Sequence, residues 1–374
     1  MLSSSVPVVT PAAFKLGDGR SVTVAERLGV GEHASVYRGW TDDAYKLQRP
    51  VALKVFNNAP LDGDALAKLA RVIRYSAYVN HPNVVDTRGM GVGEDGVPFV
   101  VTQLVSGCSL ALLAKAYAAV GRRIPTDLAL FIGIEVAEGL LAARHVLTPD
   151  GSVLGITHHD LSPRQVLLSW EGEVKVSDFG VRMALPSGSG VRDLQRMTRR
   201  VTYLSPEEIG GARGDARSDV FALGVMMFEI LRSARFPAEV HEMDLLKLAK
   251  DGYIHTGITD PILPSEISEV LFRATQIDPA ERYAHAGVFA YDLRKITMGM
   301  GVGDGRAFLR SALGEMSEGL SSMRQSTTPP GDVDEVPIRS SLFDENETTE
   351  RVSIADIILA ESGEIPVSGK REKI

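Results

Sequence analysis

Two aspartates in turn-like segments are the residues of this chain that most directly suggest chemistry. Asp160 lies in the run His-His-Asp-Leu-Ser-Pro-Arg-Gln-Val, and Asp178 begins the run Asp-Phe-Gly. One carboxylate can accept a proton from a hydroxyl group, and the other can hold Mg²⁺, a hard cation that prefers oxygen ligands. Because Asp-Phe-Gly is a common tripeptide, this pair alone does not identify a reaction.

Two glycines and a lysine upstream suggest a phosphate site. Gly29 and Gly31 lie in the run Leu-Gly-Val-Gly between two expected strands, and a backbone without Cβ atoms can approach a phosphate closely. Lys54 ends the apolar run Val-Ala-Leu-Lys, where an ammonium group is costly to bury unless it meets an anion. Each signal has an ordinary alternative, since Gly-x-Gly is common and a lysine at a strand edge can point to water.

Strands and then helices must position these residues. Runs of β-branched and aromatic residues broken by Gly, Asp and Asn predict strands through residues 21–98, interrupted by one helix at about 64–79. From Leu110 onward, helical spacing of apolar residues dominates, and Thr126 or Asp127 is the expected N-cap of the first long helix. The predicted helices of this part are 126–146, 218–231, 244–250 and 265–275.

The order of the motifs carries more information than any one of them. Gly-x-Gly at 29–31, Ala-x-Lys ending at Lys54, His-x-Asp ending at Asp160, Asp-Phe-Gly from Asp178 and Ser-Pro-Glu ending at Glu207 follow one another along the chain. This is the order and spacing of the protein-kinase signature set. Further matching positions are His-Pro-Asn at 81–83, Tyr203, Asp219 and Arg282.

The chain therefore resembles the bacterial serine/threonine protein kinases over about residues 21–300. The resemblance implies an α+β fold with two lobes: a small β-rich N-lobe at about 21–104, with one helix called αC, and a larger, mostly helical C-lobe at about 105–300. It also implies ATP with Mg²⁺ or Mn²⁺ as cofactors and a protein as substrate or signalling partner.

The resemblance implies a role for each residue near the nucleotide. Gly29 and Gly31 would cover the ATP phosphates, Lys54 would contact the α- and β-phosphates, Asp160 would be the catalytic base, and Asp178 would hold the metal. The other residues expected around the adenine and the hinge are Val30, Val36, Ala52, Thr102, Gln103, Val105 and Leu167. The residues expected to have structural roles are His158, Phe179, Gly180, Glu207, Asp219 and Arg282.

Several positions depart from the family pattern, four of them in helix αC and the catalytic loop. The αC position nine residues before the His-Pro-Asn histidine is Val72, so the Lys–Glu pair of active kinases is expected to be absent. Gln165 replaces the asparagine that binds a second Mg²⁺, with a longer side chain. Ser162 replaces the loop lysine that helps to hold the γ-phosphate. His159 replaces the arginine that reads a phosphorylated activation loop, so activation by that route is not expected.

An arginine pair, Arg199 and Arg200, stands before Tyr203 where the family usually has Gly-Thr. We hypothesise that Arg200 supplies the cation lost at Ser162 and so takes part in catalysis. The alternative is that both arginines face solvent.

Composition narrows the class of protein. The 374 residues carry a formal net charge of -8, which argues against a nucleic-acid-binding protein. The single cysteine, Cys108, excludes an intrachain disulfide and is expected to be a small buried apolar residue. Neither a signal peptide nor a run of about 20 apolar residues occurs, so we expect a soluble cytoplasmic protein without a membrane span.

The two ends differ from the middle. Residues 1–20 are expected to be a flexible lead-in, 301–324 one extra amphipathic helix, and 325–374 a mostly disordered acidic tail rich in Ser, Thr and Pro. The apolar stretch 352–360 in the tail is either a segment that docks a partner or a chance cluster.

Three functions fit these observations. An active Ser/Thr protein kinase, of ordinary or weak activity, rests on the strand lysine and the two aspartates. A pseudokinase, which would bind nucleotide or act as a signalling scaffold, rests on the departures from the pattern. A kinase of small molecules is disfavoured by the Ser-Pro-Glu motif.

Overall fold

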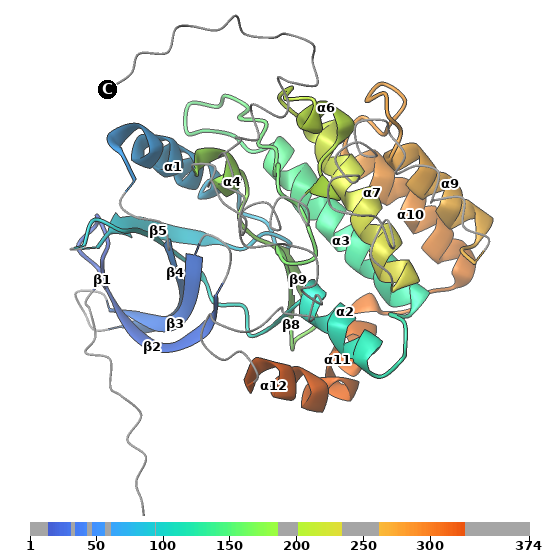
Figure 1. The fold of residues 1–374 in the computed structure, drawn as a ribbon, viewed down its shortest axis with the longest axis horizontal. Coiled ribbons are helices and arrows are strands. Elements are labelled where there is room, and N and C mark those ends of the chain that lie inside the picture. Colours follow the sequence, from blue (N-terminus) through green and yellow to red (C-terminus); the bar gives the residue numbers. More distant parts are fainter. Residues whose placement is uncertain are drawn as a thin grey trace, which may run out of the picture.

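The computed structural model describes residues 14–30, 34–42, 47–56, 61–93, 95–185, 201–233 and 262–325. These residues form two lobes (Figure 1): strands with one long helix build the smaller lobe, and mostly helices build the larger one. The predicted helix at 244–250 lies outside the described residues.

The small lobe is a six-stranded antiparallel sheet with the order β1-β2-β3-β4-β6-β5. In β4, Val51 and Leu53 point into an apolar core, so Ala52 and Lys54 lie on the opposite face. Lys54 is therefore available to groups outside that core. The strands are β1 Phe14–Lys15, β2 Ser21–Val30, β3 Ala34–Asp42, β4 Gln48–Phe56, β5 Thr87–Val92 and β6 Pro98–Gln103.

One helix, α1 (Gly63–Ser76), accompanies this sheet, as the sequence predicts. It begins at Asp62, whose carboxylate accepts a hydrogen bond of 2.7 Å from the backbone N–H of Ala65. Its buried residues Leu69 and Ile73 pack into an apolar cluster that also contains residues of the large lobe's helix α4 (Val181–Ala184). The helix thus joins the sheet to the segment that follows Asp-Phe-Gly.

The described residues of the small lobe include a segment before the expected boundary at residue 21. The short strand β1 pairs with β2, and the ring of Phe14 packs edge-to-face on Phe99 with centroids 5.0 Å apart. Leu16 is buried in the same core. Because apolar side chains of this segment complete the sheet's core, residues 14–20 are part of the small lobe.

The large lobe combines a three-stranded sheet with helices packed on α3 and α7. The buried faces of α3 and α7 form its centre, and Cys108 is buried beside them as predicted. Among the described helices, none has the length and apolar composition that crossing a membrane requires. The elements are β7 Gly107–Ser109, β8 Val166–Ser169, β9 Val174–Val176, α2 Leu110–Ala119, α3 Thr126–Arg144, α4, α6 Pro206–Ile209, α7 Ala216–Arg232, α9 Ser265–Ala274, α10 Ala286–Met300, α11 Gly305–Glu315 and α12 Ser317–Gln325.

The N-cap predicted for the first long helix is wrong. Pro125 occupies the N-cap position of α3 with an extended backbone, so Thr126 is already helical and no side chain caps this end. Asp127 lies in the first turn, where its carboxylate accepts a hydrogen bond from the N–H of Leu128. A carboxylate in the first turn still interacts favourably with the positive end of the helix dipole.

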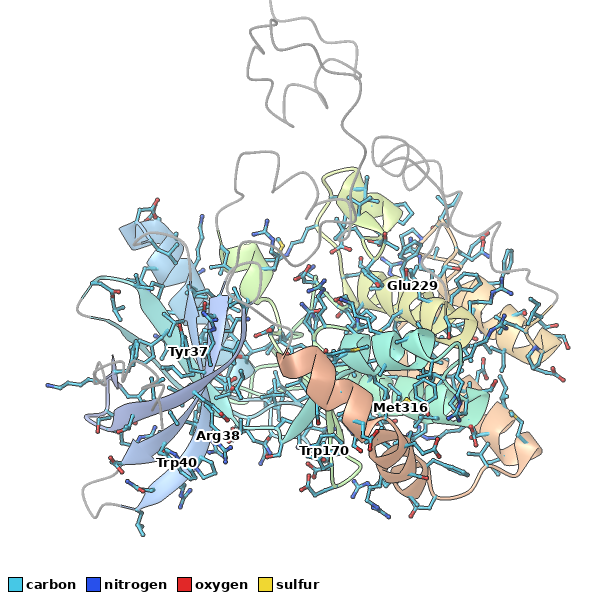
Figure 2. All side chains as sticks on the ribbon, turned by 60° about the horizontal axis from the view of Figure 1, so that its bottom comes forward. Tyr37, Arg38, Trp40, Trp170, Glu229 and Met316 are labelled. Carbon is cyan, nitrogen blue, oxygen red and sulfur yellow. The ribbon has the colours of Figure 1, made fainter. Side chains whose placement is uncertain are left out.

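The segment predicted as one extra helix forms two. The chain turns at Met316, between α11 and α12, because Met316 is itself buried and both helices must reach the core. Leu309, Leu313 and Leu320 join the core of the large lobe from these helices. Figure 2 shows Met316 beside the two helices on the face turned forward.

Candidate active site

An ion pair between the lobes marks the centre of the site. The Nζ atom of Lys54 lies 2.8 Å from Oδ1 of Asp178, and the two side chains are 22% and 31% exposed. Lys54 comes from β4, and Asp178 follows β9, so the pair joins the small lobe to the large lobe. The structure therefore brings together the lysine and one of the two aspartates that the motifs single out.

Asp178 is ionised at neutral pH although it is largely enclosed. Burial raises the pKa of its carboxyl, but the charge and hydrogen bond of Lys54, with smaller contributions from His158 and Ser177, bring the pKa below its ordinary value. Its backbone has a φ of +67°, in the left-handed region that Asp tolerates better than most residues. An ionised carboxylate in this position can hold a cation, and Lys54 is the cation that it holds here.

At the αC position, an apolar contact replaces the expected carboxylate. Val72 packs against the cluster shared by α1 and α4. A Cβ atom added to Gly180 would lie 3.3 Å from Cγ1 of Val72, so the valine lies directly over the Asp-Phe-Gly segment. Among the described residues, Asp178 is the acid that pairs with Lys54. The helix is thus seated against the site by packing, without an ion pair to the lysine.

Asp160 is held by the residues around it in the catalytic loop, residues 158–165. Its backbone N–H donates to Nδ1 of His158 at 3.3 Å, and Nε2 of the same ring lies 2.8 Å from the carbonyl oxygen of Ser177. This pattern assigns the ring proton to Nε2. Asp219 accepts the backbone N–H groups of His158 at 2.8 Å and His159 at 3.1 Å. Two acceptors, one from α7, therefore fix the turn that carries Asp160.

Phe179 joins this loop to the Asp-Phe-Gly segment. Its buried ring lies 4.8 Å from the ring of His158, measured between centroids. Gly180 follows with a φ of +66°, which favours glycine. The two predicted motifs thus pack on each other through His158 and Phe179.

Gln165 and Ser162 contact each other. The hydroxyl of Ser162 donates to the amide oxygen of Gln165, the atom predicted to bind a second metal ion. The backbone N–H and hydroxyl of Ser177 donate to the carbonyl of Gln165 at 2.9 and 3.2 Å, which places it next to Asp178. A carboxylate and an amide oxygen suit Mg²⁺ or Mn²⁺.

Nucleotide phosphates would complete such a metal site. Within the described residues, no group of three or more His, Cys, Asp or Glu side chains is arranged to hold a metal. Mg²⁺ is usually bound by one or two protein groups together with substrate phosphates. With Lys54 as the phosphate ligand, the donor set of Asp178 and Gln165 therefore fits ATP with its metal.

The residues predicted to surround the base lie along the strands next to this centre. Val36 lies opposite Lys54, and Ala52 lies opposite Thr102, in adjacent strands of the sheet. Leu167 is half-buried between two buried neighbours of β8. Gln103 donates its N–H to the carbonyl of Asp86, and Val105 is half-buried after β6. In the glycine loop, Gly29 pairs with Val36 and Val30 is exposed, whereas Gly31 and Arg200 lie outside the described residues.

Below the loop, Glu207 and Arg282 form a bidentate ion pair. Both terminal nitrogens of the guanidinium group contact the carboxylate, at 2.7 and 2.8 Å, and the arginine side chain is fully buried. Ser218 also donates to Glu207, at 2.7 Å. Burial raises the pKa of Glu207, but the hydrogen bonds from Arg282 and Ser218 outweigh this and lower it. The predicted partners are therefore in contact.

Sequence reasoning missed one residue that contacts the catalytic loop. Glu208 lies 3.1 Å from Nδ1 of His159 through its Oε1 atom, and its Oε2 atom accepts the hydroxyl and N–H of Ser205. A signal was present, because Ser205 followed three residues later by Glu208 is the pattern of a capping box. The pattern predicts a helix start but not the contact with His159.

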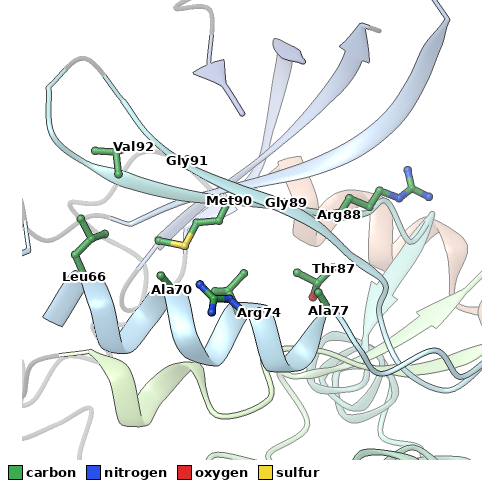
Figure 3. Close-up of a pocket in the computed structure, with 11 residues that line it drawn as sticks. Leu66, Ala70, Arg74, Ala77, Thr87, Arg88, Gly89, Met90, Gly91 and Val92 are labelled. Atoms are coloured by element: carbon green, nitrogen blue, oxygen red, sulfur yellow. The ribbon is translucent and has the colours of Figure 1, made fainter. Parts of the chain in front are cut away.

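A separate cavity of about 460 Å³ lies between α1 and β5. Figure 3 shows Leu66, Ala70 and Arg74 on the helix facing Met90 and Val92 on the strand. None of its lining residues belongs to the predicted site. Its remaining lining residues are Ile73, Ala77, Thr87, Arg88, Gly89 and Gly91.

Comparison with known proteins supports one family. A family model described as protein tyrosine and serine/threonine kinase matches residues 22–289. A probable serine/threonine-protein kinase PknB of Lactococcus lactis is 31% identical over 263 residues, which cover 70% of this chain and 39% of that protein. The tyrosine-protein kinase MasK of Myxococcus xanthus is 28% identical over 251 residues, covering 65% and 38%. The chain thus spans less than half the length of these relatives.

Solved structures agree on the fold. The crystal structure of the Mycobacterium tuberculosis PknI kinase domain matches with a TM-score of 0.53 at 21% identity, covering 79% of this chain and 99% of that domain. The serine/threonine-protein kinase PknL of the same species is 29% identical over 290 residues, covering 76% of this chain and 68% of that protein. The predicted two-lobed fold is thereby confirmed.

Proposed function

The chain belongs to the protein tyrosine and serine/threonine kinase family, and from that premise we propose that it slowly transfers the γ-phosphoryl group of ATP to a serine or threonine hydroxyl of a protein. The observation that carries this proposal is the contact between Lys54 and Asp178, with Asp160 held on the adjacent loop. These three groups are the ones that phosphoryl transfer needs most, because it depends on positioning and charge neutralisation.

Each residue has a defined task in this proposal. Lys54 holds the α- and β-phosphates, and Asp178 with Gln165 holds Mg²⁺ or Mn²⁺. When bound, the metal neutralises phosphate charge. Asp160 accepts the proton of the attacking hydroxyl while that oxygen bonds to the γ-phosphorus and ADP leaves. The hypothesis that Arg200 adds a further cation stays a prediction.

The departures from the family pattern argue for a low rate. Lys54 has no glutamate to hold it, so in the described residues it pairs with Asp178, the residue that must hold the metal. Binding of ATP with its metal must therefore redirect the lysine from the carboxylate to the phosphates. Part of the binding energy is used for that rearrangement instead of for the transition state.

The departures from the family pattern also support a second candidate, a pseudokinase that binds nucleotide as a signalling module. With Val72 at the αC position and Ser162 in place of the loop lysine, the Lys–Glu pair and one cationic phosphate contact of active kinases have no equivalent among the described residues. The loss of several parts of a preorganised site can reduce a rate by several powers of ten. Both candidates require ATP binding, and they differ in whether phosphate is transferred.

Transfer from labelled ATP decides between them. The full chain is incubated with γ-labelled ATP and Mg²⁺ or Mn²⁺, alone and with a generic basic protein, beside Asp160→Asn and Asp178→Ala. Label that appears with the wild type and is lost in both variants supports the kinase. Absence of label in a folded protein that still binds a fluorescent ATP analogue would establish the pseudokinase.

The labelled product also identifies the acceptor. One relative is named as a tyrosine kinase and others as serine/threonine kinases. We expect acid hydrolysis of the labelled protein to release phosphoserine or phosphothreonine. Phosphotyrosine alone would contradict the proposed acceptor class without affecting the kinase assignment.

A further inference from the structure

A shielded contact ties the catalytic loop to helix α6. Nδ1 of His159 lies 3.1 Å from Oε1 of Glu208, and the two side chains are 9% and 12% exposed. The other carboxylate oxygen accepts the hydroxyl of Ser205 at 2.9 Å and its backbone N–H at 3.3 Å. Salt and water screen such an enclosed contact much less than a surface pair. The two carboxylate oxygens of Glu208 thus have different partners, one contacting His159 and the other Ser205.

The backbone of His159 is restrained as well. Its φ of +63° lies in the left-handed region, which is unfavourable for a residue with a side chain. Its N–H donates to Asp219 at 3.1 Å, which helps to hold this conformation. Asp160 is the next residue, so the conformation of His159 determines the direction in which the carboxylate of Asp160 points. Restraints on His159 therefore act on the proposed base.

Two adjacent carboxylates connect α6 to two different parts of the large lobe. Glu207 binds the buried Arg282, whereas Glu208 binds His159. The short helix is therefore held between the lower part of the large lobe and the catalytic loop. Both contacts are made between side chains of the chain itself.

We infer that Glu208 is a positioning residue for Asp160 and takes the place of a phosphate on the activation segment, residues 178–207. The ring of His159 is about nine-tenths buried and its Nδ1 atom already has an anionic partner, so it cannot serve as the receptor for an added phosphate. On this inference, the catalytic loop needs no phosphorylation to hold Asp160. The inference rests on the proposed phosphoryl transfer, whose rate it explains through Asp160.

Steady-state kinetics of full-length variants test the role. Glu208→Gln keeps the shape but turns an N–H₂ group toward either His159 or Ser205, both of which are donors. We expect kcat to fall about 10- to 100-fold, as for a small misplacement of a reacting group, while the KM for ATP stays within about twofold. His159→Gln should have a similar effect, and the double variant should be no worse than either single one.

Rescue and a control make the test specific. His159→Arg should keep most of the wild-type kcat that His159→Gln loses, because a guanidinium donates well to a carboxylate. Glu138→Gln is the control, since it breaks an ion pair with Arg294 on the same lobe without contact to the loop. Wild-type protein treated with a broad phosphatase should keep its rate. A rate lost on phosphatase treatment, or equal rates for Glu208→Gln and Glu138→Gln, would overturn the inference.

Hydrogen–deuterium exchange separates the inference from the proposed function. In Glu208→Gln, amides of residues 156–162 and 201–212 should exchange faster than in the wild type and in Glu138→Gln, while the affinity for an ATP analogue is unchanged. If no variant, including the wild type, transfers phosphate, the proposed function fails and this comparison still decides the contact. Unchanged exchange in both segments refutes the positioning role.

Discussion

At the scale of single residues, the partner of Lys54 decides how the site works. A lysine in an apolar strand needs an anion, and here the anion is Asp178 at 2.8 Å. The place of the expected glutamate is taken by Val72, which packs over Gly180. In the proposed function the same carboxylate would have to serve both the lysine and the metal, so the ion pair would compete with metal binding.

A carboxylate at position 72 should relieve this competition. We expect Val72→Glu to raise kcat about tenfold, because the new carboxylate can hold Lys54 and leave Asp178 to the metal. Val72→Gln, of similar size but without charge, is the matched control and should not raise it. The measurement is steady-state transfer with Mg²⁺ and ATP. An equal gain in both variants would show that size, not charge, matters here.

At the scale of elements, α6 links separate parts of the large lobe through its side-chain contacts. Its residue Glu207 forms the bidentate pair with Arg282, whose guanidinium also donates to the carbonyl oxygens of Gln276 and Ile277. The arginine also lies over the ring of Phe221 in α7 at 5.0 Å. Because the arginine is fully buried, removal of its partner leaves a charge without compensation.

The contribution of the Glu207–Arg282 ion pair to the free energy of unfolding should depend on pH. The pKa of Glu207 is lower in the fold than in the unfolded chain, so its contribution is present above its unfolded pKa and is lost as pH falls through the folded value. We expect Glu207→Gln to lose about 3–5 kcal/mol at pH 7. The difference from wild type should shrink as the pH falls from the unfolded pKa of Glu207 through its lower folded pKa, because the carboxyl is then protonated in both states.

Urea unfolding between acidic and neutral pH measures this difference. The control is again Glu138→Gln, whose exposed partner Arg294 should make the loss less than about 1 kcal/mol at each pH. A Glu207→Gln protein with the same midpoint as wild type at every pH would contradict the prediction. A loss that does not change with pH would show that packing, not ionisation, is responsible.

At the scale of the whole molecule, the folded unit extends past the end of the family match. The match ends at residue 289, but α11 and α12 bury Leu309, Leu313, Met316 and Leu320 in the core of the large lobe. Arg310 also donates to the carbonyl oxygen of Glu171 after β8. These helices therefore belong to the same cooperative structure.

Substitutions in α11 test whether it unfolds with the rest. Leu313→Ala should lower the free energy of unfolding by about 2–5 kcal/mol, since it leaves a cavity beside fully buried neighbours. Phe308→Ala is the matched control on the same helix, and its side chain is 41% exposed, so the loss should be less than about 1 kcal/mol. Tryptophan fluorescence during urea unfolding reports both. A Leu313→Ala protein as stable as Phe308→Ala would show that α11 is not part of the core.

The sequence by itself determined the family and the fold, and it predicted which residues would meet a nucleotide and which one is missing. The order of the motifs predicted the two-lobed fold, and the spacing from His81 back to Val72 predicted the absent glutamate, because both are read along the chain. The apolar run that ends at Lys54 likewise predicted a strand lysine that would need an anion. Such local periodicities need no knowledge of long-range contacts.

Only the tertiary structure decided which side chains contact each other. The partners Lys54 and Asp178, and likewise His159 and Glu208, are far apart in the sequence and meet only after the lobes and α6 have packed. The break at Met316 had the same origin, since a continuous amphipathic pattern does not reveal where a helix must turn to follow the core. Pairing depends on how the chain closes in space, which the type and spacing of residues do not specify.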